Sequence, residues 1–263
     1  PLDFPEGTVI AKTFAYSIDR TDPSKGERLL ETRIELLRDG DWFGYSYRWN
    51  EEQTNATLLL GGGEVDVSWI HDDGSQRTNC YEIPNPNQCL NCHSQHKKYV
   101  PIGPTARNMN RDFDFHDGLA NQLEYLAKKG WLVNLPAPEK REQFPISEDS
   151  QSGSLDQRAH AWLHVNCAHC HSPSGTARTS GLDLRFSQTD PTKFGVWKSP
   201  VAAGQGSGGR AYDIVPGKPD KSILLYRMES DDPSIRMPSV GRNIVPTEAV
   251  ELIREWITAM PKE

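Results

Sequence analysis

The sequence predicts an α+β protein with a β-rich N-terminal section and a mainly helical C-terminal domain. Two observations lead to this fold class. Hydrophobic residues alternate with a period of two up to about residue 83, and they follow the helical period from residue 154 onward. The segment 134–153 is rich in proline, serine and charged residues, as is typical of an exposed connection. We therefore expect a β-rich domain over 1–133, a linker over 134–153 and a second domain over 154–263.

The N-terminal section contains two stretches of regular alternation. The apolar residues that alternate with smaller or polar ones are Phe43, Tyr45, Tyr47 and Trp49 in the first stretch, and Val65, Val67 and Trp69 in the second. Clusters of glycine, aspartate and asparagine separate the stretches, as turns separate strands. The pattern predicts four to six strands in an antiparallel sheet or sandwich, with the aromatic residues packed in the core or across strands.

The stretch after Ile83 is rich in proline and asparagine and has little periodicity, so we expect mostly loops there. A short helix is predicted near 119–129. Leu119, Leu123 and Leu126 would share one face of it, and Gly130 suits the position after its C-terminus.

Two amphipathic helices bracket the C-terminal domain. Ser154 and Gln157 spell a capping box at the start of the first helix, which runs into Cys167. The second helix begins near Pro246–Thr247. The apolar faces of the two helices consist of Leu155, Ala159, Trp162 and Leu163, and of Ala249, Leu252, Ile253 and Trp256.

Composition narrows the classes of function. The 263-residue chain is 36% hydrophobic and carries a formal net charge of −7, which disfavours nucleic acid and anionic membrane surfaces as partners. No apolar run approaches the roughly 20 residues that a membrane-spanning helix needs. The first ten residues lack the features of an export signal, so we expect any such signal to have been removed before this start.

Two Cys-x-x-Cys-His units, at 89–93 and 167–171, use four of the five cysteines. This unit is the attachment signature of a c-type haem, in which both thiols bond to haem vinyl groups and the adjacent histidine ligates iron. A zinc site made of the four cysteines is the main alternative, but zinc gives no reason for a histidine after each pair. A redox disulfide of the thioredoxin type would need a βαβ context that is absent.

We therefore predict two covalently attached haem c groups. The residues that would attach and ligate them are Cys89, Cys92 and His93 for the first haem, and Cys167, Cys170 and His171 for the second. The second haem would also supply apolar surface to the loop-rich middle of the C-terminal domain.

Met237 is the predicted second axial ligand of the second haem. It precedes Pro238 in a loop that lies shortly before the closing helix, and a thioether ligand favours ferrous iron. Met228 is the competing methionine, but it follows an apolar run at helical spacing, where a packing role explains it better.

The C-terminal domain resembles a class I cytochrome c. The resemblance rests on "CAHCH", "GLDL", "PGKPDKSILLYRM", "RMP" and "LIREWI", which occur in that order. The larger chain, through "FPEGTVIAKTF", "YSYRWNEEQTNA", "IPNPNQCLNCHS" and "IGPTARNMNRDF", is similar to a group of bacterial di-haem c-type cytochromes without an assigned physiological role. The resemblance implies the fold and the cofactor more than a substrate, and it implies further sequence upstream of this chain.

The second axial ligand of the first haem stays open. Met109 is the leading candidate, and the others are an open or water-ligated iron, His116, His71 or another group, whereas His96 is too near His93 to reach the opposite face. Cationic residues that would meet the haem propionates are Arg178, Arg185, Arg227, Arg236 and Arg242, although each also suits a surface role.

The leading functional hypothesis is electron transfer between redox partner proteins. The alternative is an enzyme of the di-haem peroxidase or oxidase type that uses an open first haem, although no distal catalytic residues are recognisable. The β-rich section would serve as a docking module in a larger complex. Haem attachment of this kind occurs outside the bacterial cytoplasm, so we expect a periplasmic or otherwise exported protein. Cys80 would remain as the single free thiol, either buried or reactive.

Overall fold

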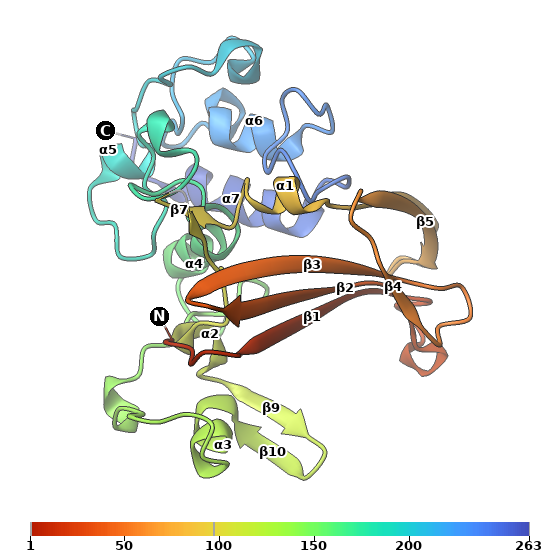
Figure 1. Ribbon diagram of the computed structural model, residues 1–263. Coiled ribbons are helices and arrows are strands. Elements are labelled where there is room, and N and C mark those ends of the chain that lie inside the picture. The colour runs from red at the N-terminus through yellow and green to blue at the C-terminus, as the bar shows by residue number, and fades with distance from the viewer. Residues whose placement is uncertain (1, 97, 263) are drawn as a thin grey trace.

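The computed structural model describes residues 2–96 and 98–262, and it contains both helices and strands, as the α+β prediction requires (Figure 1). The strands are β1 (Val9–Ser17), β2 (Glu27–Arg38), β3 (Asp41–Trp49), β4 (Ala56–Leu58), β5 (Gly63–Ile70), β6 (Gln76–Ile83), β7 (Ser94–Gln95), β8 (Lys98–Tyr99), β9 (Asp112–Phe115) and β10 (Gly118–Asn121). The α-helices are α1 (Pro86–Cys89), α2 (Ala106–Met109), α3 (Gln122–Lys128), α4 (Leu155–Cys167), α5 (Pro191–Phe194), α6 (Ile223–Glu229) and α7 (Thr247–Ala259).

The predicted strands of the N-terminal section are confirmed. β1 to β4 form an antiparallel sheet in sequence order, and β5 and β6 form a separate hairpin. The alternation places Val65, Val67 and Trp69 on the buried face of β5, where they are 3–7% exposed. Val65 and Val67 pack against Leu30 of β2 and against Ile83. The hairpin therefore covers one face of the sheet, as strand alternation requires.

The predicted helix at 119–129 is wrong at its start. The structure has β10 up to Asn121, and α3 begins only at Gln122 because the Asn121 side chain accepts hydrogen bonds from the backbone N–H groups of Leu123 and Glu124. Leu119 consequently lies on a strand and is 72% exposed. The predicted end is confirmed, since Gly130 has a φ of 75° and follows the last turn.

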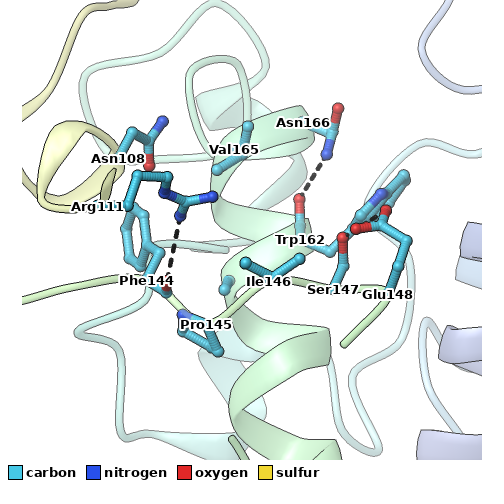
Figure 2. A pocket seen from close by; sticks show the side chains of 11 residues that line it. Asn108, Arg111, Phe144, Pro145, Ile146, Ser147, Glu148, Trp162, Val165 and Asn166 are labelled. Carbon is cyan, nitrogen blue, oxygen red and sulfur yellow. Dashed lines mark hydrogen bonds between the residues drawn. The ribbon is translucent and has the colours of Figure 1, made fainter. Parts of the chain in front are cut away.

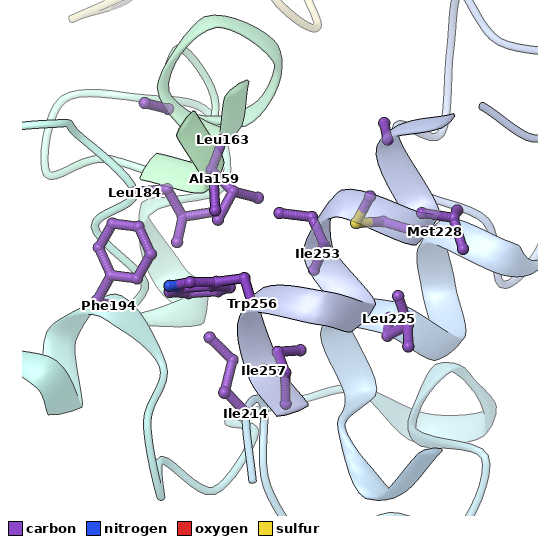
Figure 3. Close-up of a cluster of buried hydrophobic side chains, with 13 residues drawn as sticks. Ala159, Leu163, Leu184, Phe194, Ile214, Leu225, Met228, Ile253, Trp256 and Ile257 are labelled. Carbon is purple, nitrogen blue, oxygen red and sulfur yellow. The ribbon is translucent and has the colours of Figure 1, made fainter. Parts of the chain in front are cut away.

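Both helices that bracket the C-terminal domain are confirmed. α4 begins with the expected capping box of Ser154 and Gln157, and α7 follows Pro246. α7 packs against both α4 and α6, and the three helices share an apolar core (Figure 3). Trp256 is 4% exposed at its centre, and its indole N–H donates a 2.8 Å hydrogen bond to Asp156 near the start of α4.

The segment 134–153 is exposed over most of its length but is anchored by one residue. Phe144 is 3% exposed and its ring lies 4.9 Å from that of His164 on α4 and 5.0 Å from that of Phe186. Arg107 from the α2 segment stacks on the same ring at 5.6 Å. The segments on both sides of the predicted linker are therefore in contact. No helix in the described residues is both long enough and apolar enough to cross a membrane.

Candidate functional site

The two Cys-x-x-Cys-His units adopt the same local backbone conformation. In the first, the backbone N–H groups of Cys92 and His93 donate to the carbonyl oxygen of Cys89, at 3.2 and 2.9 Å. In the second, those of Cys170 and His171 donate to the carbonyl oxygen of Cys167, at 3.1 and 2.8 Å. These bonds close a single helical turn, which brings the histidine back over the first cysteine. We call the segments 89–93 and 167–171 the first and second attachment turns, after the haem attachment that the sequence predicts for them.

The first attachment turn continues the short helix α1. Asn85 and Gln88 form a reciprocal capping box at its start, with hydrogen bonds of 2.8 and 3.0 Å, and Pro86 occupies the first turn. The Gln88 side chain also donates to Glu82 of β6 at 2.7 Å. In Figure 1, α1 lies between the sheet and the C-terminal helices, in contact with β3. The sheet therefore fixes the position of the first turn.

The second attachment turn extends α4, and the following loop folds tightly back onto it. Ala177 donates its backbone N–H to the carbonyl oxygen of Cys170 at 3.0 Å. A Cβ atom on Gly175 would lie 2.2 Å from the same oxygen, so a larger residue at this position would have to displace the backbone. Gly175 thus permits the close approach of the loop to the turn.

The fold brings the two attachment turns into direct contact. The carbonyl oxygen of Asn91, in the first turn, accepts a 2.7 Å hydrogen bond from the Thr176 hydroxyl and lies 3.4 Å from the Cys170 sulfur. Ligand atoms of Cys92, His169 and Cys170 all lie within 4.8 Å of one another. Residues from the β-rich section and from the helical domain therefore build one site.

This arrangement bears on the zinc alternative. Among the described residues, the possible metal ligands that gather within one coordination sphere include Cys92 and Cys170 but neither Cys89 nor Cys167. The four-cysteine site that a zinc knuckle pair would form is therefore not the cluster that the structure shows. The cluster instead contains the second cysteine of each unit, with His169 between the two cysteines of the second unit.

His93 presents Nε2 as the nitrogen available to a metal. Its Nδ1 lies 3.1 Å from the backbone oxygen of Val100 and 2.8 Å from Oε1 of Glu35. A carbonyl oxygen and a carboxylate both accept, so Nδ1 carries the hydrogen and the lone pair resides on Nε2. The Tyr99 ring stacks on the imidazole at 5.2 Å with an interplanar angle of 14° and restrains its orientation.

His171 is oriented in the same sense by a different partner. Its Nδ1 lies 3.0 Å from the hydroxyl oxygen of Ser180, and that hydroxyl donates its only hydrogen to the Ala177 carbonyl at 2.8 Å. Nδ1 of His171 must then be the donor, which leaves Nε2 unprotonated. Burial lowers the pKa of His171, and the Arg227 charge contributes in the same direction. Both histidines thus carry a hydrogen on Nδ1, which leaves Nε2 as the ring nitrogen that could ligate a metal.

The thiols of the two turns have different environments. Burial raises the pKa of Cys89, and it raises the pKa of Cys167 to about 12. The pKa of Cys170 is lowered because the Cys92 thiol and His169 donate toward its sulfur. Since the thiolate is the nucleophile, Cys170 is the most readily activated of the four before any covalent bond forms.

Met237 lies in the loop between α6 and α7, where the sequence places it. Its backbone N–H donates to the carbonyl oxygen of Arg227 at 2.9 Å, and the Arg227 side chain is close enough to His171 to lower its pKa. Met228, by contrast, is 3% exposed and belongs to the core in Figure 3. The packing role expected of Met228 is therefore confirmed.

Arginines gather around this loop with unused donors. Arg227 donates through Nε to the Ile235 carbonyl at 2.8 Å, and Arg242 donates to the Met228 carbonyl at 2.7 Å. The Nε atoms of Arg236 and Arg242 are buried and have no hydrogen-bond partner among the described residues. Buried donors of this kind are normally paired, so they are suited to an anionic group such as a haem propionate.

The candidates for the second ligand of the first haem are dispersed. Met109 ends α2 and is half-buried, and His116 is exposed in the turn between β9 and β10. His71 lies beside Trp69, whose indole nitrogen is 3.4 Å from its Nδ1. His96 is exposed next to Pro173, Ser174 and Arg178, with which it lines a cavity of about 350 Å³ beside the two attachment turns.

A second cavity, of about 240 Å³, lies against the outer face of α4 (Figure 2). Arg111, Phe144 and Trp162 contribute to its wall, and Arg111 donates to the Phe144 carbonyl at 3.2 Å. Neither attachment histidine lines it.

Comparisons with protein-family models, curated proteins and solved structures found no match to this chain.

The structure adds site residues that sequence reasoning missed. Glu35 and Ser180 are the partners of the two histidines, and Asn91 and Thr176 join the two turns. None of them belongs to the Cys-x-x-Cys-His pattern except Asn91, which occupies one of its variable positions. Of these residues, only Ser180 could have been suspected from the sequence as a histidine partner, because it is polar and follows the second motif closely.

Proposed function

We propose that this chain is a di-haem c-type cytochrome that transfers electrons between redox partner proteins. The first haem would be held by Cys89, Cys92 and His93. The second would be held by Cys167, Cys170 and His171, with Met237 as its further ligand. The observation that carries the proposal is the contact between two attachment turns of identical hydrogen-bond pattern.

The donor set suits covalently bound haem. Each turn offers two thiols and an imidazole whose Nδ1 is held by a hydrogen bond, and buried arginine nitrogens without partners among the described residues lie in the Met237 loop. Haem iron, when bound, supplies one-electron redox chemistry, with a potential set by its axial ligands and their hydrogen bonds. The chain holds and orients the histidines, and it limits solvent access to the second site through the burial of His171.

The spacing of the two sites supports direct electron exchange between them. The sulfur atoms of Cys92 and Cys170, each of which would carry one haem, lie within 4.8 Å of each other. The β-rich section then contributes the first redox site, and its outer surface is available for a partner protein. Covalent haem attachment also implies an exported protein, so we propose a periplasmic location.

Haem content tests this proposal directly. The protein is produced with a c-type haem maturation system, denatured and extracted with acid and acetone, and two haems per chain should remain on the polypeptide. The Cys89→Ala/Cys92→Ala protein and the Cys167→Ala/Cys170→Ala protein should each retain one haem, whereas the control Cys80→Ala should retain two. Loss of all haem on extraction of the unmodified protein would refute the proposal.

A metal ion other than haem iron is the second candidate, because Cys92, His169 and Cys170 lie within 4.8 Å of one another. Two thiolates and an imidazole form a ligand set that zinc accepts. Protein made without haem maturation is the test material. Stoichiometric zinc that disappears in His169→Ala, together with no covalent haem under maturation conditions, would favour this candidate.

A further inference from the structure

Glu35 reaches the first attachment turn from the sheet. It lies on β2, and its Oε1 is 2.8 Å from Nδ1 of His93, although the two residues are far apart in sequence. The Glu35 and His93 side chains are 12% and 21% exposed, so water screens the contact only partly. The β-rich section therefore places a carboxylate directly behind the predicted iron ligand.

The neighbours of Glu35 hold it in this position. The Tyr99 hydroxyl donates a 2.9 Å hydrogen bond to the same Oε1 while its ring stacks on His93. Gly44 is opposite Glu35 in the β2–β3 pairing, and a Cβ atom on it would lie 2.7 Å from the Tyr99 hydroxyl. The absence of a side chain at Gly44 thus leaves room for Tyr99 over the sheet.

Among the described residues, the neighbouring cations form no ion pair with Glu35. Arg33 directs its guanidinium to Glu31, with hydrogen bonds of 2.6 and 3.0 Å. Lys12 is close enough to Glu35 for the carboxylate to raise its pKa, but burial outweighs this and the pKa of Lys12 is lowered overall. The charge on Glu35 therefore acts on His93 as well as on Lys12.

In the second attachment turn, the described residue in the corresponding position is not a carboxylate. The partner of His171 is the Ser180 hydroxyl, which is neutral. A carboxylate behind a ligating histidine raises the basicity of the ligand, and a more basic ligand stabilises ferric iron. The two predicted sites thus differ in the charge of the group that contacts Nδ1 of the ligating histidine.

We propose that Glu35 is a positioning residue that lowers the potential of the first haem below that of the second, so that electrons flow from the first site to the second. This inference rests on the proposed function. With both haems bound, the transfer of one electron would oxidise the first iron and reduce the second, and it would make or break no bond. Reduced partner proteins would accordingly dock nearer to the β-rich section, and the acceptor nearer to the helical domain.

Redox titration of the two-haem protein tests the inference. Glu35→Gln keeps the size and an accepting oxygen but removes the charge, so the lower of the two potentials should rise. Replacing a residue that hydrogen-bonds to a metal ligand changes metal affinity by about tenfold or more. A tenfold change in the equilibrium constant for reduction of the first haem corresponds to a shift of about 59 mV in its potential. Ser180→Ala, the matched variant at the second site, should leave that lower potential unchanged and move only the higher one.

Tyr99→Phe distinguishes an effect of the Glu35 charge on the potential from an effect of structural damage around His93. It keeps the ring on His93 but removes the hydrogen bond to Glu35, so more negative charge faces the imidazole and the lower potential should fall. Opposite shifts in Glu35→Gln and Tyr99→Phe support the inference. Shifts in the same direction, no shift, or a shift of the higher potential would overturn it. Absence of covalent haem in the unmodified protein would instead reject the proposed function itself.

Discussion

The Thr176 hydroxyl donates a 2.7 Å hydrogen bond to the carbonyl oxygen of Asn91, which lies 85 residues earlier in the chain. This bond joins the loop after the second attachment turn to the middle of the first. It is therefore a direct link between the two predicted redox sites.

Thr176→Val should weaken this link. The variant keeps the shape of the side chain but removes the hydroxyl donor to the Asn91 carbonyl, at a cost of about 1 kcal/mol in the free energy of unfolding. Chemical denaturation measures the loss, and flash photoreduction measures the rate of electron exchange between the haems, which should fall. Thr179→Val, a few residues further along the same loop, is the control. Equal stability and rate in Thr176→Val and the unmodified protein would show that the hydrogen bond does not couple the sites.

Counting free thiols tests the covalent attachment of haem to cysteine without relying on haem absorbance. If four cysteines are thioethers, denatured protein should show one reactive thiol, that of Cys80. A count of five would contradict attachment at both turns, and a count of three would indicate a single haem.

The Cys80 thiol should react slowly with alkylating reagents in the folded protein. Cys80 is exposed, but desolvation and the carboxylates of Glu64 and Asp66 raise its pKa above the ordinary thiol value. A raised pKa means less thiolate at neutral pH, so alkylation by iodoacetamide should accelerate as pH rises toward that pKa. Asp66→Asn removes one negative charge and should increase the rate at neutral pH. A rate equal to that of a free cysteine peptide would contradict the expectation.

Met237→Ala tests the second axial ligand of the second haem. The change should abolish the sulfur-to-iron charge-transfer band of the oxidised protein and lower that haem's potential. Met228→Ala is the matched control, because Met228 is 3% exposed in the apolar core. It should cost about 2–5 kcal/mol in the free energy of unfolding but leave the band in place. Loss of the band in Met228→Ala alone would transfer the ligand role to that residue.

Carbon monoxide binding to the reduced protein separates an electron carrier from an enzyme with an open haem. Two six-coordinate irons should leave the spectrum unchanged, whereas prompt binding at one site would favour the peroxidase or oxidase alternative. Met109→Ala should open the first site if Met109 is its second ligand. An unchanged spectrum of Met109→Ala under carbon monoxide would exclude that role.

Local signals in the sequence predicted several of the elements correctly. Alternation located β5, and the capping box of Ser154 and Gln157 located the start of α4, because both signals act between residues a few positions apart. The helix near 119–129 was predicted too long at its start. Asn121 caps α3, and the residues before it pair as a hairpin, which the spacing of three leucines does not reveal.

The prediction of two haem attachment sites rests on the sequence alone, because each Cys-x-x-Cys-His unit is contained in five consecutive residues. Only the tertiary structure decided that the two units touch through Asn91 and Thr176, and that His93 meets a carboxylate where His171 meets a hydroxyl. These contacts depend on how the sheet packs against α1 and on how the loop after α4 folds back. They arise from long-range packing of surfaces, which no spacing along the chain encodes.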